Sequence, residues 1–158
     1  MLKYAIRDGE IYIEVYWRNL STCIYIYVCE NKTKRLDQEI AFRGISPNVP
    51  IAIIPISLVE SALQILQGAL HYKIYSDRVK RVRNQGLFLA SLVVGQRQLS
   101  GLINSMSLKI NAGENYYIVG VGVKPPNTER CSGLTGLSTG TVSLKALVKN
   151  IKLVLSIV

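Results

Sequence analysis

The chain has a single histidine, few cysteines and no long uninterrupted apolar run. His71 is alone among 158 residues, so neither a catalytic triad nor a histidine metal cluster can be built around it. The three cysteines include no CxxC pair, which argues against a zinc site. Cys23 and Cys29 fall on one face of a strand, where we expect small buried apolar residues, with a disulfide or metal role as the alternative. No cofactor or metal is expected.

A membrane span is not expected either. The longest apolar stretch, residues 49–70, is broken by prolines, glutamines and a glutamate, and is too interrupted to read as the ~20 apolar residues of a transmembrane helix. Charged residues interrupt the N-terminal region where a signal peptide needs an apolar core: Arg7, Asp8, Glu10 and Glu14. We therefore expect a cytoplasmic protein that forms one domain over residues 1–158, since 49% hydrophobic content at this length supplies one core.

Acidic residues are scarce in the second half of the chain. Residues 1–77 carry eight basic and eight acidic side chains, whereas residues 78–158 carry eleven basic side chains and only Glu114 and Glu129 as acids. The whole net charge of +9 therefore belongs to the second half. Such asymmetry favours nucleic acid or another polyanion as a partner, the alternative being a basic surface that serves only solubility.

Strand and helix patterns alternate along the chain and predict an α/β or α+β domain, with a central mixed or antiparallel sheet packed with helices. Strands are predicted for "IYIEVYW" (11–17), "CIYIYVC" (23–29), "IAII" (51–54), "LFLASLVV" (87–94) and "YYIVGVGV" (116–123). The polar segment 30–42 is predicted to be a short helix or loop. In the strand 116–123, Gly120 and Gly122 leave one face open to close approach by a helix or ligand.

Three longer helices are predicted from apolar spacing. Ser57 and Glu60 form a capping-box pattern before an apolar stripe that runs to about Tyr72, and Gly68 within it suggests close packing against a neighbour. A second helix begins near Gln96 and ends before "NAGEN", and a third covers 142–158.

Between the first two helices lies the connector "YKIYSDRVKRVRNQG" (72–86). Its basic residues Lys80, Arg81 and Arg83 are preceded by Tyr72 and Tyr75. Basic and aromatic residues together suit an RNA contact, because arginine binds phosphate and aromatic rings stack on bases. A solvated connector with the same composition is the alternative.

Motifs for catalysis are absent from the sequence. It contains no GxxxxGK[ST], HExxH or GxSxG pattern, and "GVGVKPP" lacks the helix that a dinucleotide-binding GxGxxG requires. We expect a protein that is not an enzyme.

The turn "GQRQ" (95–98) precedes the second predicted helix. A helix start exposes unpaired N–H groups and a partial positive charge, which acidic residues normally complement. This turn offers Gly95, Gln96, Arg97 and Gln98 instead, so a phosphate is able to take the place of the acid. An ordinary turn with a surface arginine is the alternative.

The segment from "AIIPISLVESALQ" through "LVVGQRQLSGLINSMS" to "YYIVGVG" resembles the KEOPS-complex subunits of the TPRKB, or PRPK-binding protein, family, archaeal type. That family shows the same order of a short strand, a helix, a basic connector, an apolar strand, a glycine and glutamine turn, an amphipathic helix and a strand. Archaeal relatives tend to carry an arginine three residues before the glycine, where this chain has Leu92 and offers Arg97 after the glycine instead.

The resemblance implies a non-catalytic subunit of the complex that installs threonylcarbamoyl on the adenosine beside the tRNA anticodon. The partners it implies are the KEOPS kinase subunit, whose ATPase the subunit supports, and the 3′ CCA end of tRNA. The contact with the CCA end carries over to the turn 95–98, with the basic connector as its phosphate-binding neighbour. The alternatives from other classes are a free-standing basic single-stranded nucleic-acid-binding protein and an interaction-only scaffold.

Overall fold

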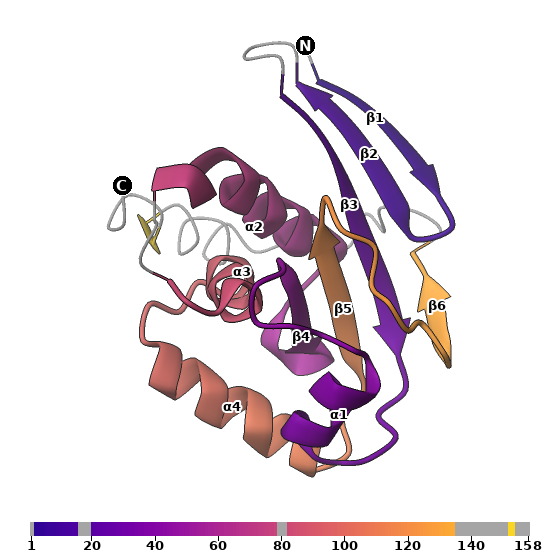
Figure 1. Cartoon of the computed structure of the whole chain (residues 1–158), viewed down its shortest axis with the longest axis vertical. Helices are drawn as coiled ribbons and strands as arrows, with labels where there is room; N and C mark the ends of the chain where they lie inside the picture. The colour runs from indigo at the N-terminus through magenta and orange to yellow at the C-terminus, as the bar shows by residue number, and fades with distance from the viewer. Residues whose placement is uncertain (1, 16–19, 79–81, 135–151, 154–158) are drawn as a thin grey trace.

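The computed structural model describes residues 2–15, 20–78, 82–134 and 152–153 (Figure 1). Within them the strands are β1 (Leu2–Arg7), β2 (Glu10–Val15), β3 (Leu20–Cys29), β4 (Ile51–Pro55), β5 (Tyr116–Val121) and β6 (Cys131–Gly133). The helices are α1 (Leu36–Phe42), α2 (Ala62–Tyr75), α3 (Gln85–Val94) and α4 (Leu99–Asn111), with 3₁₀ turns η2 (Ile56–Leu58) and η3 (Ser76–Arg78). The predicted helix 142–158 lies outside the described residues, apart from Lys152 and the buried Leu153.

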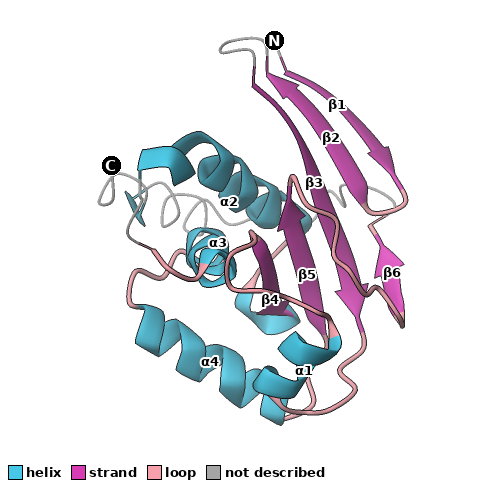
Figure 2. Cartoon of the chain, in the orientation of Figure 1, coloured by secondary structure: helices cyan, strands magenta, loops and turns pink. Residues whose placement is uncertain are grey.

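One antiparallel sheet organises the described residues. Its order is β1-β2-β3-β5-β4, and every pair of neighbours is antiparallel. Strand β3 is the longest, and its outer edge is shared: residues 20–25 pair with β2, and residues 27–29 pair with β6. The predicted α+β class, with a central antiparallel sheet packed with helices, is confirmed (Figure 2).

Alternation along the strands produces two apolar cores, one on each face of the sheet. Ile24, Ile26, Ala52 and Ile54 pack with α2 and α3, whereas the intervening residues, such as Tyr27 and Ile53, pack with α1. Because side chains of a strand point to opposite faces in turn, "IAII" serves both cores and has no polar face. Helix α4 contributes to both, with Met106 on one side and Ile110 on the other.

The sequence analysis predicted neither β6 nor β1. Strand β1 pairs with β2 in an N-terminal hairpin. Its two-residue turn consists of Asp8 and Gly9, both with positive φ (45° and 84°), between the paired residues Arg7 and Glu10. Asp-Gly is a strong signal for this type of turn. A Cβ at Gly9 would lie 2.8 Å from Gly133 Cα, so the turn lies directly against β6.

Residues 87–94, predicted as a strand, form the helix α3, and that prediction is wrong. The helix is buried on every side, from Phe88 to Val94, so it lacks the polar face whose spacing reveals a helix. Its ends carry ordinary signals: the Asn84 side chain accepts a hydrogen bond from Leu87 N (2.9 Å), and Gly95 caps the C-terminus with φ 76°. At this element the structure therefore has a helix where the resemblance implies an apolar strand.

Glycines allow α3 to approach its neighbours. A Cβ at Gly68 of α2 would lie 2.5 Å from Val93 Cα, and a Cβ at Gly86 would lie 2.2 Å from Ile51 O of β4. The close packing predicted at Gly68 is confirmed. At Gly120 the nearest group is the chain's own Val123 O, 2.3 Å from the Cβ position, so this glycine accommodates backbone and not a ligand.

Helix α2 begins later than its predicted start. The cap is Ser61, whose hydroxyl accepts a hydrogen bond from Gln64 N (3.4 Å), while Gln64 Oε1 accepts one from Glu60 N (2.9 Å). The reciprocal capping pattern therefore lies four residues beyond Ser57. The Ser57 hydroxyl donates to Glu114 Oε2 instead (2.9 Å).

Cys29 is buried, as expected, but it is not a free apolar side chain: it forms a disulfide with Cys131 across the β3–β6 pair, which is the alternative given above. Cys23 is a free, half-buried thiol. The two cysteines do share a strand face, but only Cys29 lies opposite another cysteine once β6 has paired with β3.

No single helix among the described residues is both long and apolar enough to cross a bilayer.

Candidate nucleic-acid interface

The turn Gly95–Gln98 joins two helices, α3 and α4, and not a strand to a helix as predicted. Gly95 adopts the left-handed conformation, and the N–H groups of Gly95 and Gln96 both donate to Ser91 O (2.8 and 3.1 Å). The axes of α3 and α4 differ in direction by 84°. The sharp bend brings the start of α4 to the surface at the left of Figure 1.

The start of α4 has no side-chain cap. Gln98 is its N-cap residue and makes no capping hydrogen bond, and no acidic residue lies in the first turn. Leu102 N donates to Gln98 O (3.0 Å), which closes the first helical turn. Arg97 and Gln98 are exposed, whereas Gly95 is buried. The predicted combination of an open helix start and an adjacent cation is present, and its geometry suits an anion.

The other predicted basic residues do not gather at this turn. Arg83 is exposed, but it precedes α3, whereas Gly95 follows it. A ten-residue helix is about 15 Å long, so the two ends are separated by at least that span. Lys80 and Arg81 lie outside the described residues.

Tyr72, predicted to stack on bases, lies in the core. Only 7% of it is exposed, it packs against the Phe88 ring, and its hydroxyl donates to Gln85 Oε1 (2.6 Å). Burial raises the pKa of Tyr72, which keeps the hydroxyl protonated as that donor. The stacking role predicted for Tyr72 is therefore wrong.

Leu92, where archaeal relatives of the resembled family tend to carry arginine, is 2% exposed and belongs to the core. A cation at this position of α3 would face apolar side chains. In this chain, Arg97 is the basic residue of the turn itself.

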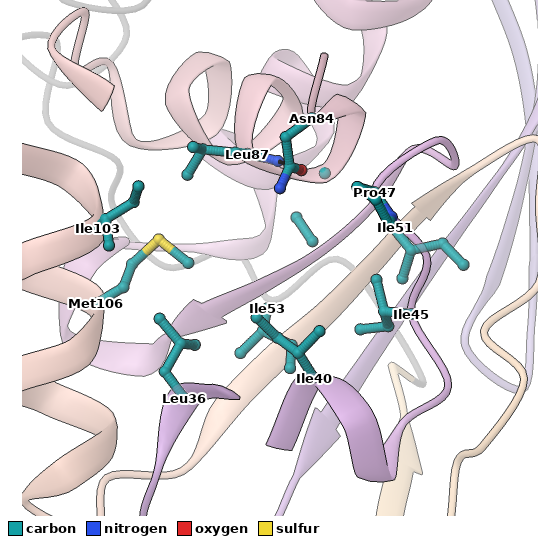
Figure 3. A pocket seen from close by; sticks show the side chains of 12 residues that line it. Leu36, Ile40, Ile45, Pro47, Ile51, Ile53, Asn84, Leu87, Ile103 and Met106 are labelled. Carbon is teal, nitrogen blue, oxygen red and sulfur yellow. Dashed lines mark hydrogen bonds between the residues drawn. The ribbon is translucent and has the colours of Figure 1, made fainter. Parts of the chain in front are cut away.

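A pocket of about 230 Å³ lies between α1, α3, α4 and the outer edge of β4 (Figure 3). Most of its lining is aliphatic, and Asn84 is its polar side chain. The residues that line it are Leu36, Ile40, Ile45, Pro47, Ile51, Ala52, Ile53, Asn84, Gly86, Leu87, Ile103 and Met106. Sequence analysis missed this site because its walls come from five separate segments, each of which reads as ordinary core.

A buried polar cluster, also missed from the sequence, lies on the α1 face of the sheet. Arg43 is fully buried, and its guanidinium donates to the Tyr116 hydroxyl (2.8 Å) and to the carbonyl of Glu129 (2.6 Å). The Tyr116 hydroxyl donates to Glu39 Oε2, and Glu39 Oε1 accepts a hydrogen bond from Lys32 N (2.8 Å).

The protonation states in this cluster are stable near neutral pH. Burial acts to raise the pKa of Glu39, but the hydrogen bonds that its carboxylate accepts outweigh burial and lower that pKa. Burial and the neighbouring Glu39 raise the pKa of Tyr116 well above its ordinary value. The cluster anchors the segment 127–130 to α1, and we assign it a structural role.

Across the described part of the chain, no three His, Cys, Asp or Glu side chains come close enough to hold a metal ion. Burial lowers the pKa of His71, whose Nδ1 has no hydrogen-bond partner, so this side chain is neutral at neutral pH.

The fold and the site together define a small basic α+β protein with an open helix start and an adjoining apolar pocket. The chain matches no protein-family model and no curated protein.

Proposed function

We propose that the protein is a non-catalytic subunit of the KEOPS tRNA threonylcarbamoyladenosine modification complex. In this proposal it binds and activates the atypical kinase of the complex and captures the 3′ CCA end of tRNA. The observation that carries the proposal is the uncapped start of α4, where exposed Arg97 stands beside N–H groups that no acidic side chain complements. These are the groups that bind a phosphate at a helix N-terminus.

The charge distribution supports a polyanionic partner. The second half of the chain carries the whole net charge of +9, and it includes both Arg97 and Arg83. Arg97 has no ion-pair partner within the described residues, whereas Lys124 is paired with Glu10 (3.4 Å). The positive charge at the turn is therefore available to a ligand.

An electrophoretic mobility-shift titration tests the RNA part of the proposal. Intact tRNA should bind more tightly than tRNA that lacks its CCA tail. Arg97→Glu should weaken binding of intact tRNA by roughly tenfold to a hundredfold, since a hydrogen bond to a charged group contributes about 1.5–3 kcal/mol. Lys109→Glu is the matched control, because it makes the same charge change at an exposed site in the last turn of α4 and should leave binding nearly unchanged.

A pull-down with an archaeal KEOPS kinase subunit tests the protein part. Kinase binding together with a preference for the CCA tail supports the proposal. Binding of generic single strands with steep salt dependence and no kinase association would instead identify a free-standing nucleic-acid-binding protein. Kinase binding without RNA binding would identify an interaction-only scaffold.

A further inference from the structure

The pocket beside α4 has the size of one ring system. Its volume of about 230 Å³ equals about eight waters at the ~30 Å³ that each takes in the liquid. Drug-sized ligands occupy larger pockets, about 300–1,000 Å³. The side chains of Leu36, Ile40, Leu87 and Ile103 surround the open space in Figure 3. Apolar walls of this kind can hold a planar ring by contact with its two faces.

One polar group at the rim is available to the edge of such a ring. Asn84 Oδ1 already accepts the hydrogen bond from Leu87 N (2.9 Å). Its Nδ2 makes no hydrogen bond within the described part of the chain and faces the pocket (Figure 3). Because the oxygen is engaged in capping α3, the amide is held in an orientation that presents the nitrogen as a donor. Nucleobases carry ring nitrogen and carbonyl acceptors on their edges.

The pocket lies close to the proposed phosphate site. Leu99, Ile103 and Met106 are spaced by four and three residues, so they share one face of α4. Ile103 lines the pocket and stands about 6 Å along the axis from Leu99, the first residue of the helix. A stacked strand rises about 3.4 Å per nucleotide along its axis, so a strand bound at the turn reaches the pocket within about two nucleotides.

The charges beside the pocket favour a nucleotide over an apolar protein side chain. Arg83, directly before Asn84, is exposed and has no ion-pair partner among the described residues. The acid near the opposite wall, Asp37, is paired with Arg35 (3.2 Å). An apolar hollow with free cations near it suits a base and its phosphates, as in single-strand-binding sites.

We propose that this pocket binds one nucleobase of a single strand, with Asn84 Nδ2 donating to the edge of the base. The inference rests on the proposed function, because it assumes that a strand reaches the turn 95–98. It adds a second point of contact, at which the base and not the phosphate is bound.

Two tryptophan variants of α4 test the inference. Ile103 is 41% exposed, so Ile103→Trp should fill the pocket without disturbing the core. Leu108→Trp is the matched control, because Leu108 is 72% exposed on the same helix and does not line the pocket. The probe is a labelled oligoadenylate about six nucleotides long, followed by fluorescence anisotropy. Thermal unfolding by circular dichroism checks that both variants fold.

Ile103→Trp should weaken oligoadenylate binding by about tenfold, as loss of one stacked base does, while Leu108→Trp binds like the wild type. A probe with an abasic site at the bound position should bind the wild type and Ile103→Trp equally. If Ile103→Trp binds as the wild type does while Arg97→Glu binds weakly, the pocket inference fails and the proposed function stands. If neither the wild type nor any variant binds the oligoadenylate probe or tRNA, the proposed function itself fails. Loss of kinase binding alone in Ile103→Trp would assign the pocket to a protein contact and overturn the inference.

Discussion

Reduction of the Cys29–Cys131 disulfide should destabilise the protein substantially. The bond joins residues 102 positions apart, so it closes a loop that contains most of the described chain. In the chain-entropy model, cross-linking a loop of about 100 residues destabilises the unfolded state by about 4.7 kcal/mol. Measured losses for native disulfides fall at about 2–5 kcal/mol, and we expect a value in the upper half of that range.

Urea unfolding of the wild type, with and without reductant, measures this loss. Cys131→Ser should have the same urea unfolding midpoint as the reduced wild type, below that of the oxidised wild type. Reductant should not change the midpoint of this variant. Cys23→Ser is the control, because Cys23 is the free thiol and its removal should leave the reductant effect intact. A thiol assay in urea should find one reactive cysteine of the three before reduction and all three after it.

Equal unfolding midpoints in the oxidised and reduced protein would refute the loop-closure reasoning. Three reactive thiols in the unreduced protein would show that β6 does not hold Cys131 against Cys29 in solution.

Two further predictions concern packing and pH. Gly68→Ala should lower the free energy of unfolding by about 1–3 kcal/mol, because the added Cβ would lie 2.5 Å from the Val93 backbone. Urea unfolding measures this loss, and Ser100→Ala, at an exposed helical position, is the control. Burial lowers the pKa of His71 below the ordinary histidine value of about 6.5, so the unfolded chain takes up the proton first and stability should fall as pH drops below about 6.5. His71→Gln should flatten that dependence between about pH 7 and pH 5, and an unchanged slope in the variant would assign the effect to other groups.

Much of the sheet was predictable because strands β2 to β5 carry local signals of their own. β-Branched and aromatic residues identify β2, β3 and β5, and the prolines that flank the apolar run Ile51–Ile54 delimit β4. The Asp8–Gly9 turn was an equally local signal for the hairpin, and attention to it would have identified β1.

Helix α3 was misassigned because burial on all sides removes the helical period. Its ten residues include only Gln85 and Ser91 as polar side chains, and Gly86 would ordinarily disfavour a helix. The signals that remained were its two ends, Asn84 and Gly95. The turn 95–98 was located correctly even so, since its glycine ends a helix as readily as a strand.

The disulfide, the Arg43 cluster and the pocket depend on register and packing between distant segments. Cys29 and Cys23 look alike in sequence, and only the pairing of β6 with β3 selects Cys29. Arg43 resembles any surface arginine after a short helix until Glu129 and Tyr116 are brought to it. No local pattern encodes such arrangements.

Under the proposed function, the close packing of α3 limits which single strands the protein can bind at both of its cations. Contacts at Gly68 and Gly86 prevent α3 from sliding between α2 and β4, so Arg83 and Arg97 are held at a set separation by a rigid spacer of ten residues. A strand that engages both cations must span that separation, whereas a shorter one engages only one of them. The buried helix would then make the protein selective for the length of the single-stranded end as well as for its charge.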